Sequence, residues 1–249
     1  MTNPPSDDPN PVPLLPAPAP QLLLPESTTS STPTLVPTSP GVDWTQPALI
    51  FCIGAPRAGK SYRAIRDCGK SSKARDVPLL IVDTAGASNF DAVPELENRK
   101  AVLAWGLSTR TPRVAKVCPA DRKELDAICE AVRRRYKAVG QGITLLLDEI
   151  AAWGPPSPTL LRLLRTYRHA RATIVATTQH VGRDVGQPIQ ALAPIFRVFR
   201  LAAPSALEWA ERELALRPEQ VRALGTGEYL PRDEETPRAA QSVQPNPIP

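Results

Sequence analysis

Residues 48–62, ALIFCIGAPRAGKSY, decide how the rest of this chain is organised. An apolar run precedes Gly54-Ala-Pro-Arg-Ala-Gly-Lys60-Ser61, and residues that favour a helix follow it. This is the pattern G-x-x-x-x-G-K-[ST] between a buried strand and a helix, the context in which the pattern binds phosphate. Its glycines allow a tight turn whose backbone N–H groups surround an anion at a helix N-terminus. The stretch therefore predicts a nucleotide-binding loop; the alternative is a chance match in a surface loop.

The residues of this loop have separate predicted roles. Lys60 is expected to reach the β- and γ-phosphates of a nucleoside triphosphate, and the hydroxyl of Ser61 is expected to bind Mg²⁺. The whole loop and the first residues of the helix should contact the nucleotide: Gly54, Ala55, Pro56, Arg57, Ala58, Gly59, Lys60, Ser61 and Tyr62. ATP and Mg²⁺ are the ligands that this prediction implies.

A second apolar run ends in two carboxylates, in the sequence Gly142-Ile-Thr-Leu-Leu-Leu-Asp148-Glu149. A continuous apolar run is typical of a central parallel strand, whose tip would meet the phosphate site. We expect Asp148 to hold the Mg²⁺ shell, and Glu149 to orient and deprotonate an attacking water. Such a run is common by itself, but its place about ninety residues after the phosphate loop gives it meaning. The alternative is a strand end that exposes two solvated acids.

A third run, Ala172-Thr-Ile-Val-Ala-Thr-Thr-Gln179, ends in hydroxyls and an amide. A polar strand tip beside a phosphate site can sense the γ-phosphate or hold the water that attacks it. Gln179 is the candidate for this role, and the alternative is a glutamine that only satisfies the strand end. Asp83 ends another buried run, residues 78–83, at the edge where ligands of such sheets bind.

The first 47 residues differ in composition from the rest of the chain. They hold thirteen of the 30 prolines, and their only charged residues are Asp7, Asp8, Glu26 and Asp43. Subtracting this −4 from the net charge of +5 leaves +9 for residues 48–249, which fits a polyanionic partner. The segment reads as a disordered or polyproline-II arm. It is either a plain tether or a docking arm whose residues 22–24, all leucine, bind a partner.

The cysteines and the apolar segments exclude several classes of protein. Cys52, Cys68, Cys118 and Cys129 show no metal-type spacing, so we expect reduced packing residues in a cytosolic setting. No run of eighteen apolar residues occurs, which predicts that the chain has no transmembrane segment. The N-terminus lacks a basic region and its leucines are interrupted by proline, so it does not resemble a signal peptide.

The remaining segments complete an alternating pattern of strands and helices. A helix is expected over residues 61–68, ending near Gly69, and an amphipathic helix over residues 119–139. The cations near the C-terminal end of the second helix complement the helix dipole; the alternative is that they contact nucleic acid. Residues 100–105 and 113–118 look like strands. Ser157 and Pro158 predict a helix start, and Ser205 to Glu208 match a capping box. Residues 194–201 predict a half-buried strand with Arg197 and Arg200 near its exposed side.

Together these patterns predict an α/β fold of the P-loop NTPase class, in its additional-strand (RecA/FtsK-like) form, with helices flanking a mostly parallel sheet. Residues 1–47 are expected to be the Pro-rich disordered arm. Residues 48–230 are expected to form the ATPase domain, and residues 231–249 a flexible C-terminal tail.

The three motifs in this order resemble one known superfamily. Residues 167–200, YRHARATIVATTQHVGRDVGQPIQALAPIFRVFR, resemble the corresponding segment of the FtsK–HerA superfamily of DNA-pumping ATPases, in which an Arg-rich helix end leads into a strand ending in Thr-Gln. The resemblance covers residues 48–230. The small size looks like that of genome-packaging ATPases of tailless, membrane-containing icosahedral phages. Pro56 and Arg57 depart from the family, many members of which have more glycine in this loop.

The resemblance implies a homo-oligomer, a hexameric ring that binds ATP between its subunits and moves double-stranded DNA through a central pore. Such rings complete each site with an arginine from the neighbour, which stabilises the transition-state charge. Arg168 is the first candidate for this role and Arg171 the second, because both precede the strand that ends in Gln179. The resemblance also implies a capsid-vertex or membrane-protein partner for the arm, and a location in the host cytoplasm or at the virion packaging vertex.

The leading interpretation is therefore an ATP-driven translocase that packages double-stranded DNA. A related interpretation is an ATPase of the Zot type, or one that serves conjugation or secretion; Zot-type proteins usually carry a transmembrane segment after the ATPase domain. Other classes also remain open: a nucleotide kinase, or a structural protein that binds ATP without hydrolysing it. Lys60, Asp148 and Glu149 argue against the last of these, since all three suit hydrolysis.

Overall fold

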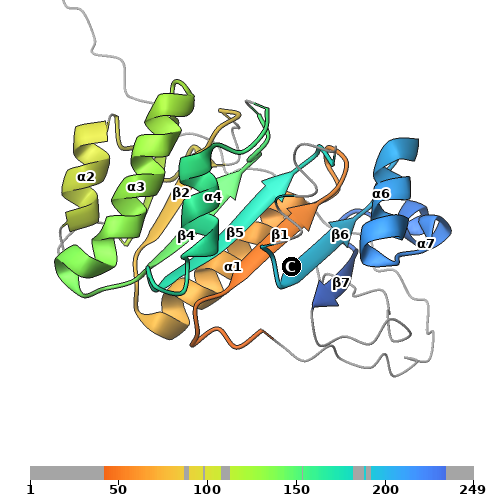
Figure 1. Ribbon diagram of the computed structural model, residues 1–249, viewed down its shortest axis with the longest axis horizontal. Coiled ribbons are helices and arrows are strands. Elements are labelled where there is room, and N and C mark those ends of the chain that lie inside the picture. Colours follow the sequence, from red (N-terminus) through yellow and green to blue (C-terminus); the bar gives the residue numbers. More distant parts are fainter. Residues whose placement is uncertain are drawn as a thin grey trace, which may run out of the picture. The chain divides into compact units, whose positions relative to one another are not determined.

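The computed structural model describes residues 42–86, 90–97, 99–107, 113–152, 154–181, 188 and 192–233. These residues form one seven-stranded sheet with the order β3-β2-β4-β5-β1-β6-β7 (Figure 1). Neighbouring strands are parallel except for β6 and β7, which are antiparallel. The predicted mostly parallel α/β sheet is confirmed. Its strands are β1 (Leu49–Ile53), β2 (Leu79–Asp83), β3 (Val114–Val117), β4 (Ile143–Asp148), β5 (Ala172–Thr178), β6 (Ile195–Phe199) and β7 (Tyr229–Asp233).

Strand β5 is the additional strand, because it lies between β1 and β4. Its register pairs Thr178 with Ile53 of β1, and Ala176 with Leu147 of β4. The carboxyl ends of these three strands therefore meet at one edge of the sheet. These are the ends at which the phosphate loop, the two carboxylates and Gln179 follow in the sequence.

Helices cover both faces of the sheet (Figure 1). Helix α1 (Lys60–Arg75) covers one face, and α2 (Arg99–Leu107), α3 (Arg122–Val139) and α4 (Pro158–Arg165) cover the other. Helices α6 (Pro204–Leu214) and α7 (Pro218–Ala223) lie beside β6. Strand β1 is buried on both faces: its alternate residues Leu49 and Phe51 join one apolar cluster, and Ile50 and Cys52 join the other. This two-sided burial is the reason that the motif strands are continuously apolar.

Side-chain caps fix the starts of two helices near the site. Ser157 caps α4, because its Oγ accepts a hydrogen bond from the backbone N–H of Leu160 at 3.1 Å, and Pro158 is the first helical residue. This confirms the predicted helix start. Asp121 caps α3 in the same way and accepts from the N–H of Glu124 at 2.8 Å. Each such cap stabilises a helix by about 1 kcal/mol.

Two expected elements differ in the structure. Helix α1 does not end near Gly69 but continues to Arg75, because Cys68 and Ser71 keep its buried face against the sheet. No atom that an added Cβ would meet lies within 4 Å of Gly69, so this glycine is simply an exposed helical residue. The predicted strand at residues 100–105 is helix α2. Its apolar residues Val102 and Trp105 are three apart and both buried, and a short apolar run does not distinguish this spacing from a strand.

The predicted exposure of Arg197 is wrong. This side chain is only 4% exposed and forms an ion pair with Asp67 of α1. Its guanidinium carbon also lies 5.5 Å from the ring centroid of Tyr229 and 6.0 Å from that of Trp44. The predicted capping box at Ser205 is wrong as well, because α6 begins at Pro204 and its N-cap is Ala203. Pro is favoured at the first helical position because it has no N–H to satisfy there.

The boundaries of the described domain differ slightly from the predicted ones. Val42 and Trp44, which precede residue 48, pack against the apolar cluster on the α1 face. Strand β7 continues three residues past 230, to Asp233. The arm with residues 22–24, and the tail beyond residue 233, lie outside the described residues.

The four cysteines are free. Burial raises the pKa of the thiols of Cys52, Cys68 and Cys129, so these three are unreactive packing residues at neutral pH. Within the described ranges, no helix is both long enough and apolar enough to cross a membrane.

Candidate nucleotide-binding site

The phosphate loop is held against two neighbouring strands by its backbone. The N–H of Gly54 donates to the carbonyl of Thr178 at 3.2 Å, and the N–H of Ala55 donates to the carbonyl of Arg200 at 2.8 Å. Gly59 has φ +93°, a conformation that favours glycine. A Cβ at this position would also lie 2.8 Å from the Cα of Gly227. Both the backbone conformation and the lack of space therefore disfavour any side chain here. The loop therefore leads α1 away from β1 in a fixed conformation.

Lys60 is the first residue of α1 and is 6% exposed. Its Nζ donates to the carbonyl of Ala55 at 2.9 Å, so the ammonium group folds back over the phosphate loop. Burial lowers the pKa of Lys60 below its ordinary value, and the carboxylates of Glu149 and Asp148 oppose this shift. A cation held so close to the loop is placed to bind an anion within it.

Asp148 ends β4 and receives two hydroxyl groups. Its Oδ1 accepts from Ser61 Oγ at 2.9 Å and from Thr177 Oγ1 at 2.8 Å. Ligand oxygens of octahedral Mg²⁺ lie roughly 2.1 Å from the metal, which puts adjacent ones about 3 Å apart. The oxygen atoms of Ser61 and Asp148 have this spacing, so the two residues fit the predicted Mg²⁺ site. No cluster of three or more His, Cys, Asp or Glu side chains that could hold a metal occurs among the described residues.

Glu149 turns sharply from the end of β4 toward β5. It has φ +54°, in the left-handed region that a residue with a side chain seldom adopts. Its Oε1 accepts from the backbone N–H of Gln179 at 3.0 Å and from Thr178 Oγ1 at 3.4 Å. Strain of this kind persists where the surrounding contacts impose it, and it is concentrated at functional sites. The carboxylate of Glu149 is therefore held in one position beside the strand that carries Gln179.

Threonines support both carboxylates, and sequence reasoning did not single them out by role. Thr177 Oγ1 accepts from the N–H of Glu149 at 2.9 Å while it donates to Asp148. Thr84, which follows β2, donates its Oγ1 hydrogen toward the carbonyls of Asp148 and Glu149, at 2.7 and 2.8 Å. Asp83 lies beside Asp148 in the sheet register, and its Oδ1 accepts from the N–H of Ala85. It ends β2 at the predicted end of the sheet but is buried and does not line the cavity described below. The sequence signal that could have indicated these threonines is the polar residue at the end of each central strand.

These groups line one cavity of about 480 Å³. It brings together the predicted Lys60, Ser61, Asp148, Glu149 and Gln179, which come from three different strand tips. Gly54, Ala55 and Ala58 do not line it; they contribute backbone to the loop. The full lining is Pro56, Arg57, Gly59, Lys60, Ser61, Tyr62, Ile65, Ala85, Phe90, Asp148, Glu149 and Gln179.

Arg168 and Arg171 do not lie at this cavity. Both precede β5, and the strand rise of roughly 3.3 Å per residue puts Arg171 about 25 Å from Gln179 at its other end. Arg168 Nε donates to the hydroxyl of Tyr167 at 2.9 Å, and the Arg171 guanidinium lies 5.7 Å from the ring centroid of Tyr136. Neither arginine can reach the nucleotide site of its own chain. Both lie before the start of β5, at the opposite end of that strand from the cavity.

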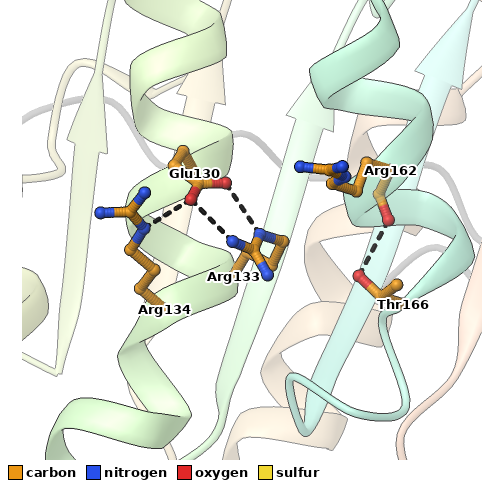
Figure 2. Close-up of polar contacts among 5 residues, drawn as sticks. All are labelled: Glu130, Arg133, Arg134, Arg162 and Thr166. Atoms are coloured by element: carbon orange, nitrogen blue, oxygen red, sulfur yellow. Dashed lines mark hydrogen bonds and ion pairs between the residues drawn. The ribbon is translucent and has the colours of Figure 1, made fainter.

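The basic end of α3 is partly neutralised within the chain. Figure 2 shows Glu130 bound by Arg133 and Arg134, with Arg162 of α4 nearby. These hydrogen bonds lower the pKa of Glu130 to about 2. Arg135 is buried and donates a hydrogen bond to Gln141. The basic residue in the last turn of α3 is Lys137, which can complement the helix dipole there. Contact between this surface and nucleic acid stays a prediction.

Solved structures show the same fold. The genome packaging NTPase B204 from Sulfolobus turreted icosahedral virus 2, in complex with AMPPCP, matches with a TM-score of 0.61 at 20% identity, over 80% of this chain and 96% of that one. The conjugative coupling protein TrwBΔN70 matches with a TM-score of 0.55 at 11% identity, over 81% and 85%. The pCW3 conjugation coupling protein TcpA matches with a TM-score of 0.52 at 13% identity, over 81% of this chain and 60% of that one.

This chain has the fold of packaging and conjugation P-loop NTPases. No protein-family model matches it, and no curated protein does. At these identities the similarity establishes the additional-strand P-loop fold alone.

Proposed function

We propose that this chain is an ATP-hydrolysing motor that translocates double-stranded DNA, and that it packages a viral genome into a preformed capsid. The observation that carries the proposal is the convergence of Lys60, Asp148, Glu149 and Gln179 on one cavity. A buried cation, a metal-binding carboxylate and a second, separately held carboxylate are the groups that hydrolysis of a triphosphate requires.

Each group has a role in the proposed reaction. The N–H groups of the loop and the Lys60 ammonium bind the β- and γ-phosphates; Ser61 and Asp148 would hold Mg²⁺, which would neutralise phosphate charge. Water attacks the γ-phosphorus while Gln179 orients it and Glu149 accepts its proton; the bond from the γ-phosphorus to the β,γ-bridging oxygen breaks, and ADP leaves with that oxygen. The backbone N–H of Gln179 donates to the Glu149 carboxylate, so the proposed base is held beside the residue whose side-chain amide would orient the water.

The proposed oligomer is a hexameric ring in which each site is completed by the neighbour. Arg168 or Arg171 would supply the cation that stabilises transition-state charge in trans. Both lie at the opposite end of β5 from the cavity, so in this proposal either arginine would act only on the site of a neighbour. A ring also gives the basic domain a path for DNA, whose phosphates attract the +9 charge of residues 48–249. The proposed location is the host cytoplasm or the packaging vertex of the virion.

A second candidate is an assembly, secretion or conjugation ATPase. The fold similarity to the coupling proteins TcpA and TrwB favours it. Both candidates share the hydrolytic site and differ in the partner that holds the ring. In the packaging candidate, the Pro-rich arm would bind a capsid-vertex or membrane protein.

The deciding experiment is ATP turnover with and without duplex DNA, followed by imaging with a non-hydrolysable ATP analogue. We expect duplex DNA to stimulate turnover and the analogue to produce closed rings. ADP formation that depends on AMP would instead indicate a nucleotide kinase. ATP binding without turnover under any condition would indicate a structural ATP-binding protein.

A further inference from the structure

The nucleotide cavity has an apolar end that the proposed hydrolysis does not use. Tyr62 and Ile65 of α1 line it on one side, and Ala85 and Phe90, which follow β2, also line it. These four residues have no role in binding phosphate or metal. They nevertheless belong to the same cavity as Lys60 and Ser61.

Tyr62 has an unusual exposure for an aromatic residue of this domain. Among the described residues only Tyr62 and Val114 are large, apolar and exposed, and 41% of Tyr62 is exposed. The guanidinium carbon of Arg66 lies 5.9 Å from the Tyr62 ring centroid, a weak cation–π contact. A tyrosine that lines a ligand cavity and remains exposed there is available to a flat partner.

Phe90 and Ile65, which also line the apolar end, are packed in the core, whereas Ala85 is exposed. Phe90 is 2% exposed and belongs to the apolar cluster on the α1 face, and Ile65 packs against that cluster. Tyr62 and Ile65 are three residues apart and therefore share one side of α1. The helix rise of roughly 1.5 Å per residue puts Ile65 about 6 Å beyond Ser61 along the axis. The cavity thus extends along the first two turns of α1, starting from the phosphate loop.

The chemistry of a nucleoside triphosphate matches this division into a polar and an apolar end. Its phosphates need the cation, the N–H groups and the metal-binding oxygens, whereas its base presents a flat π-face that stacks on aromatic side chains. The cavity volume of about 480 Å³ lies in the range of sites that enclose a whole small ligand, roughly 300–1,000 Å³.

We propose that Tyr62, Ile65, Ala85 and Phe90 form the subsite for the nucleobase, in which Tyr62 stacks on the purine ring. The inference rests on the proposed function, since it takes the phosphate end of the cavity as given. It extends that function by assigning the residues that distinguish a purine nucleotide from a bare polyphosphate chain.

The test compares two ligands on the full-length protein. Isothermal titration with Mg²⁺ and either ATP or inorganic tripolyphosphate gives one Kd for each. In Tyr62→Ala, the Kd for ATP should rise about tenfold, as expected for loss of one stacking contact. The Kd for tripolyphosphate should stay the same, because the phosphate end is unchanged. Tyr62→Phe should restore ATP binding, because stacking uses the ring and not the hydroxyl.

Val114→Ala is the matched control, because Val114 is the other exposed apolar side chain and lies at the start of β3. It should change neither Kd. An unchanged Kd for ATP in Tyr62→Ala, or an equal rise for both ligands, would overturn the base subsite. Failure of the proposed function looks different: turnover would be absent in the wild-type protein while the ratio of the two Kd values still depended on Tyr62.

Discussion

Replacing Glu149 with Gln separates the proposed chemistry from binding and folding. Glutamine has the same shape as glutamate and keeps an oxygen that can accept a hydrogen bond from the backbone N–H of Gln179. In the wild-type protein this nitrogen lies 3.0 Å from Glu149 Oε1. It removes the negative charge and therefore the ability to take a proton from water. Both residues carry a Cβ, so the backbone strain at φ +54° is the same in the two proteins.

The structure allows the two effects of Glu149→Gln to be estimated separately. A positioned general base contributes roughly 10²–10⁴ in rate, or about 2.7–5.4 kcal/mol at 1.36 kcal/mol per tenfold. The folding effect is smaller. Exchanging a charged acceptor for a neutral one weakens the hydrogen bond to the Gln179 N–H by about 1 kcal/mol. We therefore expect kcat to fall by at least two orders of magnitude in a protein that remains folded.

The assay is single-turnover phosphate release, combined with ATP titration and chemical unfolding of the same preparation. Glu208→Gln serves as a matched control, because Glu208 is exposed on α6, away from the cavity. A Glu149→Gln protein that binds ATP and turns it over within about tenfold of the wild type would refute the assignment of Glu149 as general base. Loss of ATP binding in this variant would show that the carboxylate has a structural role instead.

Three further predictions test other parts of the structure. Gly59→Ala should lower the free energy of unfolding by about 1–3 kcal/mol and weaken ATP binding, because the residue has φ +93° and its Cβ would clash with Gly227; urea unfolding and titration measure both. The pKa of Glu130 is lowered to about 2, so its contribution to stability is present above roughly pH 4 and is lost as the pH falls toward 2. The difference in stability between the wild type and Glu130→Gln should therefore disappear over that range. Arg168→Ala subunits mixed with Glu149→Gln subunits should recover turnover if the arginine acts in trans, and intact rings without recovery would exclude Arg168.

The convergence of the site could be predicted from the sequence because parallel strands have a fixed geometry. Three apolar runs, each followed by polar residues, must place those residues at the same edge once the strands are parallel. Lys60, Asp148 and Gln179 were therefore predictable as neighbours before any distance was known. The roles of Thr84 and Thr177 were not, because they depend on which strands lie beside β4, and strand order is not written in any local pattern.

Helix α2 shows where periodicity fails. Residues 100–105 contain apolar side chains that fit a strand as well as a helix, and the segment is too short for the two periods to separate. Tertiary packing decided the outcome, because Val102 and Trp105 bury the same helical face and Arg135 of α3 stacks on the Trp105 ring. The burial of Arg135 could not be predicted from the sequence either, because Arg135 is one of three consecutive arginines and the other two bind Glu130.

The burial of Arg197, which the sequence pattern did not predict, connects the fold to the site. Alternation of apolar residues with arginine in residues 194–201 predicts an exposed arginine only if the second face of the strand meets water. In this sheet that face is covered by α1, which supplies Asp67 as the partner of Arg197. A buried ion pair adds little net stability, but loss of one partner leaves an uncompensated charge and costs about 3–5 kcal/mol. The pair therefore fixes the position of α1 relative to β6, and α1 is the helix that carries Lys60 and Ser61. The arginine that seemed to face solvent instead holds the phosphate-binding helix in place.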